Sequence, residues 1–283
     1  MKVFVYGGTG LVSGRLIELL LGKGHQVTAG SRNPSAQKKT SGLEWVQTDA
    51  FKPELGQNGL NGADAVFLFS PPGYTNQFDI LSPWIDSAKK NGVKKVVLMT
   101  AMGVDSAPPE APMRKLELYL ESSGLQYVIL RPNWFMQNFH TFWISGILKD
   151  RKIYFPGGDA KTSFIHSHDI SASALAVLES DSFNNSAYNL TGKEALTHSE
   201  VAKLLSSATG IGIEYADITP EAFKSGLLSA GLPEDYSDFL VMIAGALKAG
   251  YSSAVLDNVQ KLTGKSPLSF KEYAEENKSK WQG

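Results

Sequence analysis

The sequence predicts an α/β fold with a doubly wound parallel sheet, followed by a smaller, mostly helical C-terminal lobe. Short apolar stretches alternate with helical patterns over the first 131 residues. Continuous apolar strands with short connections are typical of a parallel sheet whose two faces are covered by helices. The 283 residues, 42% of them hydrophobic, suffice for such a core and a second lobe. We expect the sheet domain at 1–150 and the lobe at 151–283, interleaved with it.

The apolar runs define six strands, and the gaps between most of them carry a helical pattern. The expected strands are Val3–Tyr6, Gln26–Gly30, Leu43–Thr48, Ala65–Phe69, Lys95–Thr100 and Tyr127–Arg131. The first helix should bury Leu11, Ile17, Leu20 and Leu21 and end at Gly22.

After Arg131 the pattern changes to an aromatic segment, NWFMQNFHTFW, and then to helices. One helix is expected to be capped near Ser167 or Asp169. Four later helical segments open on cap candidates, namely Thr197, Thr219, Asp235 and Ser269.

Three glycines follow the first strand, at the point where the chain must turn sharply into the first helix. Gly7, Gly8 and Gly10 remove Cβ atoms there, so that a diphosphate can approach backbone N–H groups at the positive end of the helix. The glycine spacing alone is common by chance. Its place directly after a strand, in a strand–helix–strand unit of about 30 residues, is the context of a Rossmann dinucleotide-binding turn.

The end of the second strand indicates which dinucleotide binds. A carboxylate at this point would accept a hydrogen bond from the free 2′-OH of NAD. The segment Gly30–Asn33 holds no acid, whereas Arg32 offers a planar fork of donors suited to a 2′-phosphate, and Ser31 and Asn33 can add hydrogen bonds. We therefore expect NADP (NADPH) as the cofactor; the alternative is that Arg32 is a solvated surface residue.

Composition excludes several other classes of protein. A formal net charge of −1 gives no sign of a nucleic-acid-binding or anionic-membrane surface. The absence of cysteine removes disulfides, thiolate nucleophiles and cysteine-ligated clusters. The chain shows no signal-peptide pattern and no apolar run approaching the roughly 18–20 residues of a membrane span. We expect a cytoplasmic protein with no nucleic-acid or membrane partner.

Several motifs together resemble a known family. These are GGTGLVSG at the start, Arg32 after the second strand, Thr100 at the end of the fifth, and SGLQYVILRPNWFMQNF near the middle. With them the chain resembles, over nearly its whole length, the NmrA-like group of atypical short-chain dehydrogenases. Within that group it is similar to festuclavine and agroclavine dehydrogenases and, more distantly, to triphenylmethane reductases and quinone oxidoreductases. The resemblance implies an NADPH-dependent oxidoreductase.

The resemblance also implies a set of cofactor contacts. They are Gly7, Thr9, Gly10, Leu11 and Val12 on the diphosphate, Arg32 with Ser31 on the 2′-phosphate, Asp49 and Ala50 beside adenine, Phe69, Ser70 and Pro71 on the ribose, and Thr100, Pro132, Asn133 and Trp134 facing the nicotinamide.

The sequence departs from the family at the proton donor. Typical short-chain dehydrogenases place a Tyr four residues before a Lys on the helix after the fifth strand, and the phenol donates a proton. Met113 and Glu117 stand at these positions here, and a thioether has no proton to give. Arg114 and Lys115 should point away from Met113 into solvent. The catalytic residues therefore stay unassigned, with Thr100 as a candidate.

Without an acid, the chemistry that remains is hydride transfer to an acceptor that needs no proton from the protein. An iminium is already cationic, and a quinone can take its proton from water. A pocket lined by Trp134, Phe135 and Phe139, with Tyr74 from a loop, would suit such a planar, hydrophobic partner. Part of the aromatic segment should instead belong to the core.

Other functions have less support in the sequence. A non-catalytic, redox-sensing NADP(H)-binding protein of the NmrA-like type remains the main alternative. His166, His168 and Asp169 could suggest a metal site, but the pair lies at a strand-to-helix junction with no third His nearby, and we expect no metal. Serines lack the Gly-x-Ser-x-Gly context of a hydrolase, and a nucleotide-sugar epimerase would need the missing Tyr and Lys. Substrate identity, direction of reaction and oligomeric state stay open.

Overall fold

A computed structural model describes residues 1–52 and 54–282. Packing divides the chain into two compact units, the first comprising Met1–Pro132 with Ile170–Asn189 and the second Asn133–Asp169 with Leu190–Gly283. This division differs from the boundary expected at residue 150, because the chain leaves the sheet directly after its sixth strand and later returns to it. No helix of the described residues is long and apolar enough to cross a membrane.

The first unit is built on a seven-stranded sheet in the order β3-β2-β1-β4-β5-β6-β8. Its strands are β1 (Lys2–Val5), β2 (Gln26–Ser31), β3 (Leu43–Gln47), β4 (Ala65–Phe69), β5 (Lys95–Met99), β6 (Gln126–Pro132) and β8 (Ser186–Leu190). The pairs from β3 through β6 are all parallel. The doubly wound α/β fold predicted from the apolar runs is therefore confirmed, and β8 is an additional strand.

The strand order reverses between β1 and β4, which places a topological switch point beside the glycine turn. The register keeps the carboxyl ends level: Val5 lies opposite Ala29 and Phe67, and Met99 lies opposite Phe69 and Leu130. In such sheets ligands bind outside the carboxyl ends of the strands at the switch point. Most of the residues expected to bind the cofactor follow these strand ends.

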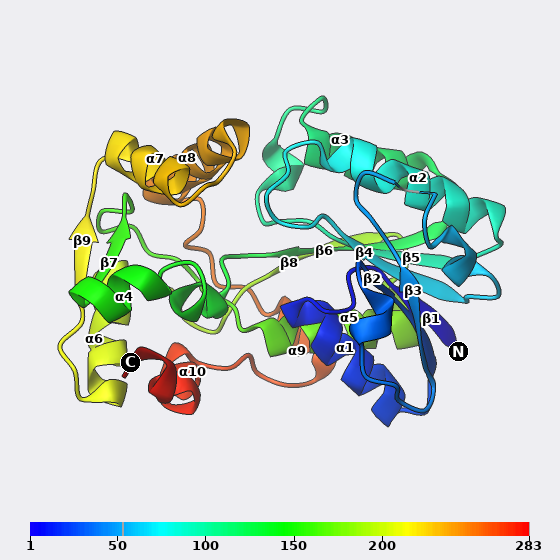
Figure 1. Ribbon diagram of the computed structural model, residues 1–283, viewed down its shortest axis with the longest axis horizontal. Helices are drawn as coiled ribbons and strands as arrows, with labels where there is room; N and C mark the ends of the chain where they lie inside the picture. Colours follow the sequence, from blue (N-terminus) through cyan, green and yellow to red (C-terminus); the bar gives the residue numbers. More distant parts are fainter. Residues whose placement is uncertain (53, 283) are drawn as a thin grey trace. The chain divides into compact units, whose positions relative to one another are not determined.

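Helices cover both faces of the sheet (Figure 1). The helices α2 (Gln77–Lys90) and α3 (Pro112–Ser122) lie on one face, and α1 (Leu11–Gly22) and α5 (Ser167–Glu179) lie on the other. Under α2, the ring of Trp84 stacks on Phe4 with centroids 5.2 Å apart, and such pairs contribute about 0.5–1.5 kcal/mol beyond their buried area.

The buried stripe of α1 differs in part from the predicted one. Val12, Leu16, Ile17 and Leu20 are buried, whereas Leu11 is 52% exposed. Leu11 is the first residue of the helix, so it projects past the strand ends instead of packing on the sheet. The expectation that Leu11 is a core residue is wrong.

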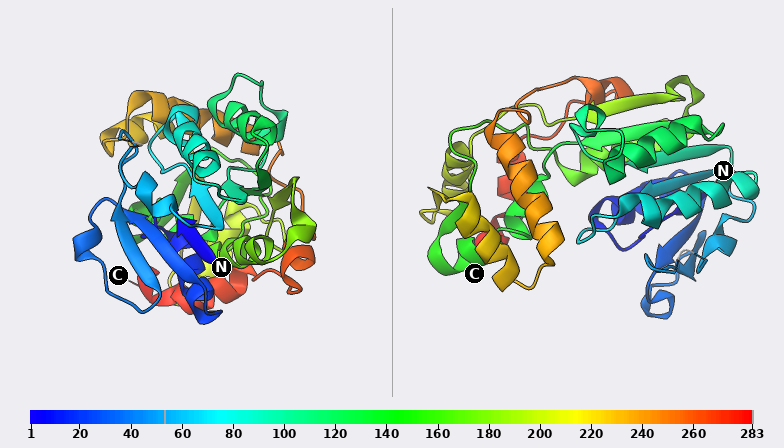
Figure 2. Two further views of the ribbon diagram at one scale, coloured as in Figure 1. Left: turned by 90° about the vertical axis from the view of Figure 1, so that its right-hand side faces the viewer. Right: turned by 90° about the horizontal axis from the view of Figure 1, so that it is seen from above.

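The second unit is mostly helical, as expected, with one small sheet that the sequence did not reveal. Its helices are α4 (Ile144–Asp150), α6 (His198–Thr209), α7 (Pro220–Ser229), α8 (Glu234–Lys248), α9 (Asn258–Thr263) and α10 (Phe270–Asn277). The strands β7 (Lys152–Phe155) and β9 (Glu214–Asp217) pair in parallel. In Figure 2, α7 and α8 lie side by side as a helical hairpin.

Three of the four predicted helix caps in this unit are confirmed. The Thr197, Thr219 and Ser269 side chains each accept a hydrogen bond from the backbone of the first helical turn. Asp235 is not a cap, because α8 already begins at Glu234 after Pro233. A proline at this point fixes the backbone entering the helix without any side-chain oxygen.

A buried histidine lies at the centre of the aromatic core of the second unit. The His198 ring stacks on Phe155 at 4.7 Å and on Tyr215 at 5.3 Å between centroids. Neither ring nitrogen has a hydrogen-bond partner among the described residues. Burial lowers the pKa of His198 to about 3, so the imidazole is neutral in the folded protein.

This histidine predicts a pH-dependent stability. The unfolded chain takes up a proton at His198 below about pH 6.5 and the folded protein does not, so we expect the free energy of unfolding to fall by roughly 1 kcal/mol per pH unit below 6.5. Burial lowers the pKa of His140 and His166 to about 4, which acts in the same direction. Burial raises the pKa of Asp169 to about 6, which opposes it as the pH falls below 6.

The variant His198→Phe should retain the aromatic packing and reduce this slope. Urea unfolding at pH 7 and pH 5 of the unmodified protein and the variant measures it. Equal slopes in the two proteins would show that His198 is protonated to the same extent in the folded and unfolded states.

Candidate functional site

The glycine turn leads directly into the open end of α1. Gly7 has a φ of +59°, and a Cβ atom there would lie 2.8 Å from the ring of Phe69. A Cβ on Gly10 would lie 3.3 Å from the carbonyl oxygen of Gly7. Gly10 caps α1 without a side-chain hydrogen bond, and the first turn contains no acid. The exposed Thr9 and Leu11 border the turn, and Val12 is buried behind it. This end of the helix is suited to an anion.

The guanidinium of Arg32 lies free at the end of β2. Ser31 is buried, and its Oγ accepts a hydrogen bond of 3.2 Å from the N–H of Asn33. Arg32 is exposed, and among the described residues no hydrogen bond or ion pair of its side chain is found. A cation without an internal partner at this position can bind an external phosphate.

The loops after β3 and β4 bring two predicted regions together. The carboxylate of Asp49 accepts a hydrogen bond of 2.8 Å from the N–H of Phe51. The Phe51 ring is 67% exposed and meets Tyr74 edge to face at 5.1 Å. Burial, together with the nearby Asp49 and Tyr74, raises the pKa of Tyr6 to about 12, so its phenol stays protonated at neutral pH. Phe51 was not among the residues predicted for this region.

The remaining residues of this edge are accessible to different degrees. Phe69 packs against Gly7, and Ala50, Ser70 and Pro71 are half-buried. The Ser70 hydroxyl donates to the Pro71 carbonyl oxygen at 3.3 Å.

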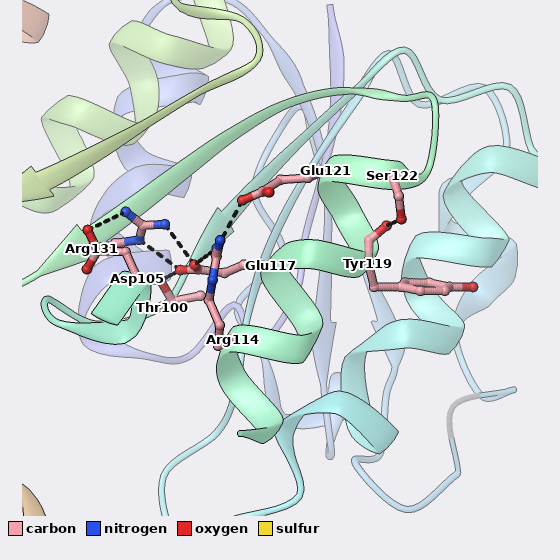
Figure 3. Close-up of polar contacts among 8 residues, drawn as sticks. All are labelled: Thr100, Asp105, Arg114, Glu117, Tyr119, Glu121, Ser122 and Arg131. Atoms are coloured by element: carbon pink, nitrogen blue, oxygen red, sulfur yellow. Dashed lines mark hydrogen bonds and ion pairs between the residues drawn. The ribbon is translucent and has the colours of Figure 1, made fainter. Parts of the chain in front are cut away.

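A buried polar network lies behind the ends of β5 and β6 (Figure 3). The Glu117 side chain is fully buried, and its carboxylate accepts hydrogen bonds from Thr100 at 2.7 Å, Arg114 at 2.8 Å and Arg131 at 2.9 and 2.8 Å. Arg131 also pairs with Asp105, in a short turn after β5, at 3.2 Å.

Arg114 was expected to face solvent, and this is wrong. Its side chain is only 18% exposed because it pairs with Glu117 and, at 3.1 Å, with Glu121. Lys115 is exposed as expected, with Nζ 4.0 Å from the centroid of the Phe78 ring. The sequence did not reveal the network, because its members come from separate strands and a helix.

The segment after β6 places its predicted residues in different surroundings. Pro132 and Asn133 are buried. The Asn133 amide donates to Ser163 Oγ at 2.8 Å and to the Ser252 carbonyl oxygen at 2.9 Å, and its side-chain oxygen accepts from the Trp134 N–H. The polar atoms of this side chain are thus engaged within the second unit.

The three aromatic residues expected to contact substrate differ in how deeply they are buried. Trp134 and Phe135 are half-buried, and the Trp134 ring lies 6.3 Å from Trp143 and 5.4 Å from Phe155. Phe139 is 0% exposed. The expectation that Phe139 contacts substrate is wrong, because the aromatic core encloses it on every side.

Comparison with known proteins indicates the same kind of ligand as the residues at the strand ends, a nicotinamide dinucleotide. Residues 7–181 match a family model described as NAD(P)H-binding. The chain is 30% identical to agroclavine dehydrogenase of Claviceps fusiformis, over 99% of each protein. It is also 30% identical to an NAD(P)H azoreductase of Xenophilus azovorans, over 96% of each.

Solved structures give the same fold. The triphenylmethane reductase of Citrobacter sp. superimposes with a TM-score of 0.84 at 22% identity, covering 99% of this chain and all of that one. The predicted resemblance to the NmrA-like dehydrogenases is confirmed. The chain belongs to the NAD(P)H-binding family and is an NAD(P)H-dependent oxidoreductase of this type.

Proposed function

We propose that the protein is an NADPH-dependent reductase that transfers hydride to a planar, conjugated small molecule such as a quinone or an iminium. The observation that carries the cofactor choice is the exposed guanidinium of Arg32 at the end of β2, which has no partner among residues 1–52 and 54–282 and lies in a segment without an acid. Arg32 and Ser31 would hold the 2′-phosphate, and the turn from Gly7 to Val12 would hold the diphosphate at the open end of α1. The missing Cβ atoms at Gly7 and Gly10 support this fit.

The other strand ends complete the proposed binding site. Asp49 and Ala50 would border the adenine, Phe69, Ser70 and Pro71 the adjoining ribose, and Thr100, Pro132 and Asn133 the nicotinamide. When bound, NADPH supplies the hydride, and the chain binds it, orients it and excludes water.

The class of hydride acceptor that we propose follows from the residues at the positions where the family has its proton donor. We place Met113 and Glu117 where other members have Tyr and Lys. Met113 has no proton to donate, and Glu117 accepts four hydrogen bonds. An acceptor that needs no proton from the protein is compatible with this site. The relatives' names, an azoreductase and an agroclavine dehydrogenase, support a conjugated substrate.

The proposal is tested by following the loss of NADPH absorbance with a naphthoquinone or a cyclic aryl iminium as acceptor. We expect turnover with both, and a higher kcat/KM for NADPH than for NADH. A protein that binds NADPH tightly but oxidises it with neither acceptor would instead be a redox-sensing NADP(H)-binding protein.

Trp134 and Phe135 are the aromatic residues that we propose for the substrate, while Tyr74, which lies in the first unit, stays a prediction. Trp134→Ala is expected to weaken binding of a planar quinone by about threefold to tenfold, since an aromatic pair contributes roughly 0.5–1.5 kcal/mol. NADPH affinity should stay unchanged. Fluorescence titration with both ligands measures this, and Phe142→Ala, at an exposed ring in the same segment, is the matched control. Equal quinone affinity in the Trp134 variant and the unmodified protein would remove Trp134 from the site.

A further inference from the structure

The Glu117 network determines which way the hydroxyl of Thr100 points. A carboxylate offers about four lone-pair positions, two on each oxygen. Oε1 of Glu117 accepts from Thr100 Oγ1 and from Arg131 Nε, and Oε2 accepts from Arg131 Nη2 and Arg114 Nη1. All four positions are therefore occupied by donors, two on each oxygen.

The two arginines show that the Glu117 carboxylate acts only as a hydrogen-bond acceptor. A guanidinium only donates hydrogen bonds and does not lose its proton in proteins. Three of the four bonds come from guanidinium groups, so Glu117 is an acceptor in all of them. The fourth bond, 2.7 Å long, must then use the hydrogen of the Thr100 hydroxyl. That hydrogen points into the protein, toward α3.

Thr100 consequently presents only lone pairs on its other side. It directly follows β5, at the carboxyl edge of the sheet where the ligand crevice of this fold lies. Its residue exposure is 8%, so a small part of it is reachable from outside. In the unmodified protein it can accept a hydrogen bond from a ligand and has no hydrogen left to donate to one.

We infer that Glu117, clamped by Arg131 and Arg114, is a positioning residue that makes Thr100 a hydrogen-bond acceptor for the nicotinamide half of the cofactor. By withholding a proton donor at this strand end, it limits the enzyme to electrophiles that take hydride without a proton from the protein. This inference rests on the proposed reductase function and adds to it the residue that orients Thr100 and the exclusion of saturated ketones as substrates. Thr100 would accept a hydrogen bond from the carboxamide N–H groups or from the hydroxyls of the nicotinamide ribose.

An iminium or a quinone can be reduced without a proton donor in the protein, whereas a simple ketone cannot. An iminium that takes hydride becomes a neutral amine, while the cofactor leaves as NADP⁺. A quinone that takes hydride becomes a hydroquinone monoanion, whose charge is delocalised and which takes one proton from water. A saturated ketone would become a localised alkoxide, which needs a donor beside it. Since general acid catalysis contributes about 10²- to 10⁴-fold, we expect kcat/KM for cyclohexanone to lie at least about 100-fold below that for a naphthoquinone.

The first arm of the test measures binding by calorimetry. It uses NADPH and adenosine 2′,5′-bisphosphate, which contains the adenosine and the 2′-phosphate of the cofactor but neither the nicotinamide nor its ribose. Thr100→Val, which removes the acceptor, should weaken NADPH binding by about threefold to tenfold, the loss expected for one hydrogen bond, and leave the fragment unaffected. Thr100→Ser keeps the hydroxyl and should bind both ligands as the unmodified protein does. Unchanged fragment binding also shows that the variant is folded.

The role of Glu117 is tested by Glu117→Gln, with Glu121→Gln as the control. The amide has two lone-pair positions instead of four and cannot satisfy both arginines and Thr100, so it should give the same selective loss of NADPH affinity as Thr100→Val. Glu121 lies on the same helix and pairs with Arg114, and its replacement should change neither affinity. Selective loss in Thr100→Val but not in Glu117→Gln would overturn the positioning role.

The second arm compares acceptors in the unmodified protein. Turnover of the naphthoquinone and a cyclic iminium but not of cyclohexanone supports the inference. Cyclohexanone reduction within about tenfold of the quinone, or full NADPH affinity in Thr100→Val, overturns it and leaves the reductase function intact. Failure to reduce any of the three acceptors refutes the reductase function itself, while the binding arm still decides the role of Thr100.

Discussion

Replacing Glu117 with alanine is expected to lower the free energy of unfolding by about 3–5 kcal/mol, the loss typical of removing one partner from a buried ion pair. The variant leaves Arg131, whose side chain is 8% exposed, without its two bonds to the carboxylate. Arg114 also loses a partner, although Glu121 remains within reach. Urea unfolding at neutral pH measures the change.

The matched control is Glu121→Ala, which removes a carboxylate that is 31% exposed and pairs with the same Arg114. An ion pair this close to solvent contributes about 0–1 kcal/mol. The double variant Glu117→Leu/Arg131→Met should recover part of the stability, because no buried charge then stays unpaired. Similar losses in Glu117→Ala and Glu121→Ala would show that the buried network does not stabilise the fold.

Arg32→Ala is expected to weaken NADPH binding by roughly tenfold to more than a hundredfold, because a hydrogen bond to a charged group contributes about 1.5–3 kcal/mol. NADH, which has no 2′-phosphate, should bind the variant about as well as it binds the unmodified protein. Calorimetric titration of both proteins with both cofactors gives the four dissociation constants.

Lys39→Ala is the control for Arg32, since it removes an exposed cation from the loop that follows the same strand. It should change NADPH affinity only slightly, because screening reduces long-range attraction at physiological salt. An equal loss of NADPH and NADH affinity in Arg32→Ala would place the arginine away from the 2′-phosphate.

The sheet could be predicted because its determinants are local in the sequence. Apolar runs such as Ala65–Phe69 are short, continuous and bounded by turn residues, and the structure has that strand with the same bounds. The glycine turn was equally visible, because the need for Gly7 and Gly10 arises from backbone conformation and close approach within one unit. The small strands β7 and β9 were missed because their few residues mix buried and exposed positions, whereas the equally short β1 is a continuous buried apolar run.

The Glu117 network could not be predicted from spacing because its members are far apart in the chain. Thr100, Glu117 and Arg131 come from the end of a strand, the middle of a helix and the end of the next strand, and only the packing of α3 on the sheet brings them together. For the aromatic residues, the sequence predicted a substrate contact that the structure does not have. Phe139 carries the same hydrophobic signal as Trp134, and nothing in the sequence distinguishes an enclosed ring from a half-buried one.

The central claim, that the protein reduces a small molecule with NADPH, is tested most directly by a single-turnover experiment. The protein is loaded with NADPH deuterated at C4, in separate experiments for each face of the ring, and mixed without oxygen with one equivalent of a cyclic aryl iminium. We predict that deuterium from one of the two labelled cofactors appears in the amine product as the reduced nicotinamide absorbance decays. Bound NADPH that stays reduced, with the iminium recovered unlabelled and unchanged, would contradict the claim.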